Sequence, residues 1–152
     1  MSNHVIRFTI PGKPHGHQRH RARVVQAGKR SFAQFYDTVG NKAFKALCQQ
    51  KFTERDISAW DPTGPMELDV TAVFNCTKAP RKREPHKESW RVKKPDLDNI
   101  VKAVMDALNG LGYLDDSQVV IIHARKYEAR QGEPARLHVG LSHILDGMHP
   151  PG

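Results

Sequence analysis

One helical segment, residues 98–109, constrains the fold more than any other part of the chain. Its apolar residues recur at spacings of three and four, which places them on one face of a helix. Pro95 and Asp98 are typical of a helix start, with Asp98 as the N-cap. Asn109 and Gly110 are typical of a helix end. Because such a stripe needs another element to cover it, the segment predicts a layered domain. The stripe consists of Ile100, Val104, Ala107, Leu108 and Leu111.

Strand patterns on both sides of this helix predict a sheet for it to pack on. Residues 66–74 alternate apolar and polar side chains, the period of a half-buried strand. Residues 5–10, 119–128 and 137–141 are also strand-like, and the last two are predicted to form a hairpin. An amphipathic helix is predicted over residues 31–52. Its apolar positions are Phe35, Val39, Ala43, Ala46, Leu47 and Phe52. The predicted order β-α-β-α-β-β defines an α+β domain with a small mixed sheet and two main helices.

Length and composition limit the class of protein. With 152 residues the chain suits one domain, predicted over residues 1–145, with 146–152 as a disordered tail. Its two cysteines, Cys48 and Cys76, cannot form a cysteine-rich zinc site or a disulfide framework, so both are predicted to be buried free thiols. No apolar run reaches membrane-spanning length and no signal-peptide pattern is present. We therefore expect no membrane partner and a location in the bacterial cytoplasm.

The chain is strongly basic. Its 24 lysines and arginines exceed its 16 acidic residues, for a formal charge of +8, which favours a polyanionic partner such as nucleic acid. The alternative is a protein that is basic without binding nucleic acid. Residues 13–30 form a predicted arm without acidic side chains, and residues 77–94 a predicted mobile loop. The candidate DNA-binding residues are Lys13, Arg19, Arg21, Arg23, Arg81, Lys82, Arg83, Lys93 and Lys94.

Four carboxylates flank the helix over residues 98–109. Asp96 and Asp98 precede or begin it, and Asp115 and Asp116 follow it. The helix rises about 16 Å, and the following segment, if extended, covers about 20 Å. The return segment can therefore bring all four carboxylates to one place. Clustered hard oxygen ligands suit Mg²⁺ or Mn²⁺, which promote phosphodiester hydrolysis.

The same residues also allow a purely structural interpretation. Asp98 can be only an N-cap, and Asp115 and Asp116 can form only a turn before a strand. Lys102 follows Asp98 by four residues on the same helix face, where it can reach a phosphate or form an ordinary helix ion pair. Asp106 continues that face, and its position favours a structural role.

The segment Lys94-Pro-Asp-Leu-Asp-Asn-Ile-Val-Lys-Ala-Val-Met-Asp-Ala-Leu-Asn-Gly, followed by Asp115-Asp116-Ser-Gln-Val, resembles the RusA family of Holliday junction resolvases. The strong match covers about residues 93–120, and Pro11-Gly12-Lys13-Pro14 looks like the opening of phage-type members. The resemblance implies an α+β homodimer that uses Mg²⁺, with Mn²⁺ as a substitute. Such a dimer would nick two strands of a four-way DNA junction in recombination and repair.

The resemblance also implies roles for individual residues. Asp96, Asp98 and Asp116 match the metal-binding aspartates, Asp115 matches their neighbour, and Lys102 matches the functional lysine. The loop over 77–94 and the arm histidines His15, His17 and His20 have no counterpart that can be carried over. For these histidines, contact with phosphate is favoured over a metal site.

Two other classes of protein remain as alternatives. A branched-DNA-binding protein without catalysis could use the same basic surface. An aspartyl phosphatase also carries two aspartates one residue apart, but they follow a strongly apolar strand, whereas residues 91–95 here are mostly basic. The sequence specifies neither a cleavage sequence nor a phage or cellular origin.

Overall fold

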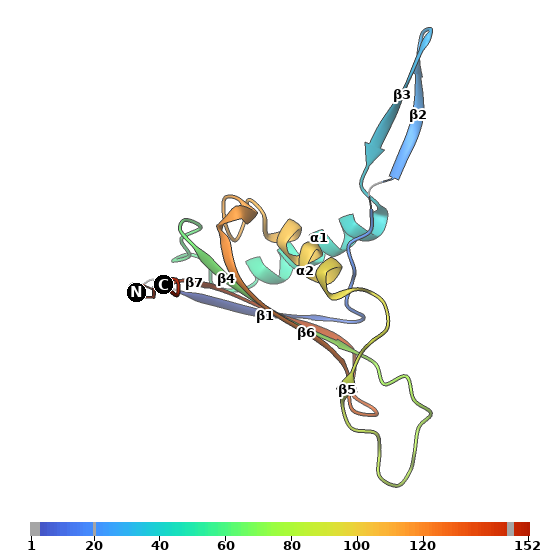
Figure 1. Ribbon diagram of the computed structural model, residues 1–152, viewed down its shortest axis with the longest axis vertical. Coiled ribbons are helices and arrows are strands. Elements are labelled where there is room, and N and C mark those ends of the chain that lie inside the picture. Colours follow the sequence, from blue (N-terminus) through green and yellow to red (C-terminus); the bar gives the residue numbers. More distant parts are fainter. Residues whose placement is uncertain (1–3, 20, 146–147) are drawn as a thin grey trace.

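The computed structural model describes residues 4–19, 21–145 and 148–152, with only the backbone described for Arg21, Phe32 and residues 34–36. Two helices lie on one face of a five-stranded sheet, and a separate hairpin extends away from them (Figure 1). The α+β class with a small mixed sheet is confirmed. The elements are β1 (Val5–Pro11), β2 (Arg21–Ala27), β3 (Arg30–Tyr36), α1 (Val39–Thr53), β4 (Met66–Phe74), β5 (Ser89–Trp90), α2 (Leu97–Leu108), the short 3₁₀ turn η1 (Asp116–Gln118), β6 (Val119–Glu128) and β7 (Arg136–His143).

The strand order of the sheet is β1-β7-β4-β6-β5. β4 runs parallel to β6 and antiparallel to β7, so it separates them. The predicted hairpin between residues 119–128 and 137–141 is therefore wrong. The central place belongs to the most apolar strand, because a strand there is covered on both edges and on one face. Residues 129–135 are long enough to cross over it.

The core lies between the helices and the inward face of β4. Side chains at alternate positions of β4, from Met66 to Phe74, are at most 2% exposed. On α2, the predicted stripe residues Ile100, Val104 and Leu108 are fully buried, which confirms the helical pattern. Within the described residues, no helix is both long and apolar enough to cross a lipid bilayer.

The predicted helix over residues 31–52 begins too early. Residues 30–36 form β3, which pairs with β2 through a two-residue turn in which Gly28 takes a φ of +64°. The arm over 13–30 is thus half of a β-hairpin and not only a loop. Its basic composition conceals the alternating strand pattern.

α1 begins at Val39 because Thr38 caps it. The Thr38 hydroxyl accepts the backbone N–H of Asn41 at 3.1 Å. The later start changes the buried face: Phe44, Cys48 and Phe52 are buried, whereas Val39 is 84% exposed. Of the predicted stripe, Phe52 is buried and Leu47 packs against the core.

Two smaller predictions have mixed outcomes. Cys48 is a buried free thiol as expected, but Cys76 lies beyond the end of β4 and is half-buried. The loop over 77–94 is irregular except for the two residues of β5. Asp146 and Gly147 of the predicted tail lie outside the described residues, and residues 148–152 have no regular structure.

Candidate active site

An open hollow of about 550 Å³ lies beside α2. Asp98 in the first turn of α2, Lys102 one turn later, and Asp116 of η1 all line it. The structure therefore brings together two of the three predicted metal-binding aspartates and the predicted lysine. The remaining lining residues are Leu97, Val101, Met105, Asp106 and Ala124.

A buried tyrosine holds the turn that returns Asp116 to α2. The chain reverses at Gly110, which takes a φ of +80° that favours glycine. The hydroxyl of the fully buried Tyr113 donates to the backbone carbonyl of Met105 at 2.7 Å. Burial, with the nearby charge of Asp116, raises the pKa of Tyr113, so the hydroxyl keeps the proton that it donates.

Asp115 points into its own turn and is not among the residues that line the hollow. Its carboxylate accepts the backbone N–H of Ser117 at 3.1 Å and also the Ser117 hydroxyl, which caps η1. These hydrogen bonds lower the pKa of Asp115. The side chain of Gln118 completes the cap and donates to the carbonyls of Pro62 and Gly64, each at 2.9 Å. For Asp115, the structural interpretation as a turn residue therefore describes the geometry.

Asp96 occupies the N-cap position of α2 but makes no capping hydrogen bond. The prediction of Asp98 as the N-cap is wrong by two residues, and Asp98 lies inside the first turn. The Asp96 carboxylate instead accepts the Lys94 ammonium at 2.8 and 2.9 Å. This hydrogen bond, together with the charges of Lys94 and Lys126, holds the pKa of Asp96 below its ordinary value. Asp96 is therefore ionised at neutral pH, next to but not among the residues that line the hollow.

The donor set fits a hard divalent cation only in part. Among the described residues, no three His, Cys, Asp or Glu side chains are grouped closely enough to hold a metal ion. Asp98 and Asp116 nevertheless face the same hollow, and in the described part of the chain neither carboxylate has a hydrogen-bond or ion-pair partner. Asp96 is held by a lysine whose side chain is 85% exposed and can exchange. Two free carboxylates and a third nearby suit an ion that keeps several waters.

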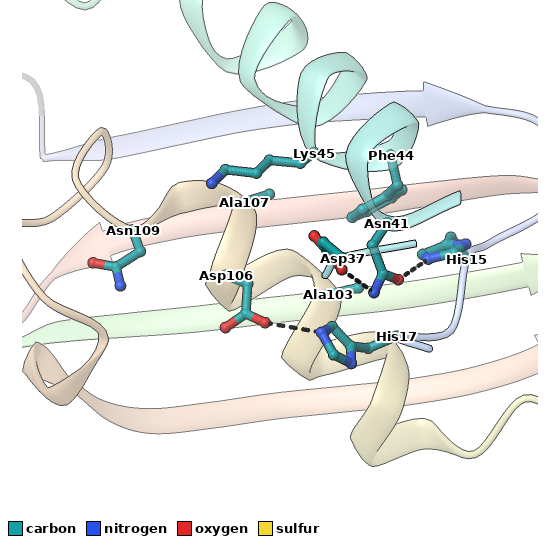
Figure 2. Close-up of a pocket in the computed structure, with 10 residues that line it drawn as sticks. All are labelled: His15, His17, Asp37, Asn41, Phe44, Lys45, Ala103, Asp106, Ala107 and Asn109. Atoms are coloured by element: carbon teal, nitrogen blue, oxygen red, sulfur yellow. Dashed lines mark hydrogen bonds and ion pairs between the residues drawn. The ribbon is translucent and has the colours of Figure 1, made fainter. Parts of the chain in front are cut away.

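A second hollow, of about 310 Å³, lies between α1, α2 and the part of the arm before β2, which contains His15 and His17 (Figure 2). Asp106 lines both hollows. Its carboxylate lies 3.3 Å from Nε2 of His17, and the backbone N–H of His17 donates to the Asn99 carbonyl at 2.9 Å. The arm is thus fastened along α2, and Asp106 has the structural role that its position suggested.

Asn41, buried at the start of α1, is the centre of this fastening. Its amide nitrogen donates to the Gln18 carbonyl at 2.8 Å and to Asp37 at 2.7 Å. Its amide oxygen accepts the Gln18 N–H at 3.0 Å and lies 2.8 Å from Nε2 of His15. The His15 ring also stacks on Phe44. These contacts of Asn41 have no signature in the sequence, although Asp37 and Thr38 are a signal for a helix start.

The predicted DNA-binding residues lie in separate groups. In Figure 1 the hairpin β2–β3 extends from one end of the molecule, and the loop between β4 and β5 extends from the other. Lys94 donates to Asp96 at 2.8 Å, and Lys93 donates to the Thr77 hydroxyl at 3.4 Å. The Arg21 side chain and all of His20 lie outside the described residues. The described cations in the predicted set are exposed: Lys13, Arg19, Arg23, Arg81, Lys82, Arg83, Lys93 and Lys94.

Projecting basic segments around an open acidic hollow are the features of an enzyme that hydrolyses a nucleic-acid backbone. The comparison with known proteins specifies the class further. Residues 11–141 match the family Endodeoxyribonuclease RusA, and the chain belongs to this family. It is therefore an endodeoxyribonuclease, as the sequence motif had indicated. Nucleases of this family generally depend on a divalent metal ion.

Two curated relatives cover most of the chain. The uncharacterized protein YqaN of Bacillus subtilis (strain 168) is 33% identical over 135 residues, which cover 83% of this chain and 89% of the relative. The crossover junction endodeoxyribonuclease rusA of Lactococcus phage r1t is 31% identical over 112 residues, covering 73% and 79%. The resemblance to the RusA family is thereby confirmed.

Proposed function

We propose that this protein resolves four-way DNA junctions by paired nicks, with Mg²⁺ held by Asp96, Asp98 and Asp116. The single observation that carries the proposal is the hollow shared by Asp98, Asp116 and Lys102 in a chain of the RusA family. The phage relative, whose name assigns it to crossover junctions, supports the four-way junction as substrate. It also supports a place in DNA recombination and repair inside a bacterial cell, on phage or prophage DNA.

The chain's own residues would divide the work around the scissile phosphate. When bound, the divalent cation supplies Lewis-acid stabilisation of the negative charge that develops on the phosphate. Lys102, which forms no ion pair within the described residues, is free to donate to a phosphate oxygen from inside the hollow. Lys94 would release Asp96 toward the cation and turn its ammonium to the DNA backbone. Asp115 would contribute by holding η1, and with it Asp116.

The basic arm and loop would hold the DNA backbone on either side of the hollow. Contacts to phosphate position a duplex without reading its sequence. This agrees with the spread of exposed cations over two distant segments, one with Arg19 and Arg23 and the other with Arg81, Lys82 and Arg83. Neutralising either segment is expected to weaken binding and flatten its salt dependence.

A homodimer would contain two such hollows, one in each subunit, and each would make one of the two paired cuts. The apolar side chains of Val120 and Ile122 in β6, and of Leu114 just before η1, are exposed. They support a dimer interface along β6. Sedimentation equilibrium would measure the assembly. A monomer at the concentrations that cut junctions would remove the dimer from the proposal.

The decisive experiment is cleavage of a labelled synthetic four-way junction with Mg²⁺, with Mn²⁺ and with EDTA. Asp116→Asn should abolish the paired nicks while junction binding in Ca²⁺ persists. Asp56→Asn is the matched control and should cut at the normal rate, because Asp56 lies in an exposed loop and, among the described residues, binds only Ser58. Tight junction binding without any cut under all divalent metals would instead indicate a non-catalytic branched-DNA-binding protein.

A further inference from the structure

Trp90 is held in place and yet left in solvent. It exposes 75% of its surface, whereas Trp60, the other tryptophan, packs against the core. In β5 its backbone pairs with Tyr127 of β6. The next residue, Arg91, turns inward: its side chain is 10% exposed, and its guanidinium lies 4.0 Å from the centre of the Phe74 ring. Arg91 directly follows β5, and its inward side chain holds the end of this strand while the Trp90 side chain stays in solvent.

A hollow of about 580 Å³ opens beside Trp90, a size within the usual range of ligand sites. Tyr127, Arg125 and Arg130 line it together with Glu88 and Glu133. Arg130 donates to Glu88 at 2.7 Å, and the two glutamates balance the two arginines in charge. The hollow is therefore nearly neutral and lined by flat groups, which suits a neutral ring better than a phosphate.

The basic loop over residues 77–94 supplies positive charge near this hollow, and Arg81 at its base is bound to Gln131. The Gln131 side chain accepts the backbone N–H of Arg81 at 3.0 Å and donates to its carbonyl at 2.8 Å. The backbone N–H of Gln131 donates to the His86 carbonyl at 2.9 Å. Since Gln131 follows Arg130, Arg81 to Arg83 are fastened at the same end of the sheet as Trp90 (Figure 1).

β6 also joins this hollow to the acidic one. Ala124 lines the acidic hollow, and the next residue, Arg125, lines the hollow beside Trp90. Lys126 donates to the Pro95 carbonyl at 2.9 Å, directly before Asp96. A DNA strand bound at one hollow could therefore reach the other around the edge of the sheet.

We propose that the hollow beside Trp90 binds one unpaired DNA base, stacked on the indole, while the cations of the basic loop hold the adjoining phosphates. This deepens the proposed function and rests on it, because continuous stacking is interrupted at a branch point, where a base opens more readily than within duplex DNA. Stacking on an aromatic side chain accepts any base. The hollow would thus recognise the structure of the DNA without reading its sequence.

The test uses a short oligothymidylate in EDTA, so that its readout is independent of cleavage. In Trp60→Phe, Trp90 is the sole tryptophan, and its fluorescence should be quenched as the oligonucleotide binds. Trp90→Ala should weaken binding about tenfold or more, whereas Trp90→Phe should retain most of the affinity. The salt dependence should not change in Trp90→Ala, because no phosphate contact is removed. In the control Lys82→Ala it should become shallower.

Unchanged Trp90 emission at saturating oligonucleotide, or equal affinity of Trp90→Ala and the intact protein, would overturn the proposal. The proposed function is judged separately by junction cleavage. A protein that quenches through Trp90 but never cuts junctions keeps this site and loses the resolvase function. A protein that cuts junctions with Trp90 irrelevant does the opposite.

Discussion

Replacement of Gly16 by alanine tests whether the arm positions the active site. A Cβ added to Gly16 would lie 2.5 Å from Cβ and 3.3 Å from Cγ of Pro95, the residue before Asp96. Carbon atoms in contact are about 3.5–4.0 Å apart, so the two segments must separate by about 1 Å. The proline ring cannot rotate away, and the arm is fastened to Asn99 and Asn41. The strain must therefore move the start of α2 or break the fastening.

Two effects of Gly16→Ala are expected. Overpacking costs about 1–3 kcal/mol of the free energy of unfolding, which lowers the Tm by roughly 3–10 °C for a chain of this length. A displacement of about 1 Å at catalytic groups costs up to about a hundredfold in rate. Cleavage should therefore fall by about 10- to 100-fold, with junction affinity in Ca²⁺ nearly unchanged.

Single-turnover cleavage of a four-way junction, with a thermal melt, would measure both effects. The control is Gly140→Ala in β7, where the new Cβ would lie an ordinary 3.7 Å from Arg7 and Asp69. That substitution should preserve the cleavage rate. If Gly16→Ala melts and cuts like the intact protein, the close packing of the arm on Pro95 plays no part in placing Asp96.

Three further predictions concern buried groups. Burial would raise the pKa of Glu128, but the Thr77 hydroxyl and nearby cations hold it below its ordinary value of 4.5. The ionised Glu128 therefore stabilises the folded protein above pH 4.5, and this stabilisation is lost as the pH falls through the lower pKa of the folded state. Glu128→Gln should cost about 1.5–3 kcal/mol at pH 7 in urea unfolding and flatten the acid limb; an unchanged acid limb would contradict this. Burial raises the pKa of Cys48 to about 12, so a thiol reagent should modify only Cys76 in the native protein, and two fast thiols would disprove the packing. Tyr113→Phe removes the hydroxyl that donates to the Met105 carbonyl and should cost about 1–3 kcal/mol in urea unfolding; no loss would mean that water replaces the hydroxyl.

Local patterns in the sequence were sufficient for the elements nearest the chemistry. The apolar stripe of α2 and the alternation of β4 need only a few neighbouring residues to be recognised, and both elements form where predicted. The start signal at Thr38 lies inside the predicted helix, and the buried positions of α1 differ from the predicted ones by one or two residues: Asn41 and Phe44 are buried rather than Val39 and Ala43. The hairpin β2–β3 is hidden in the sequence for two reasons: arginines take apolar positions in β2, and the spacing of Phe35 and Val39 extends the predicted helix back through β3.

The candidate site was predictable in its residue types but not in its partners. The motif indicated Asp96, Asp98, Asp116 and Lys102 as one group, and the hollow contains all but Asp96. Lys94 holds Asp96, and Asp115 caps η1. Both contacts depend on the directions in which side chains leave the turns on either side of α2. Such directions follow from φ and ψ at single turn residues, which residue types alone leave undetermined.

Sequence by itself determined the α+β class, the carboxylates and the basic character of this protein, because each is a property of adjacent residues. Only the tertiary structure decided that β4 separates β6 from β7, and that Asn41 fastens the arm to α2. It likewise placed Trp90 beside Tyr127. These outcomes depend on contacts between residues far apart in the chain, where the burial of the whole core selects one arrangement among many that local preferences allow.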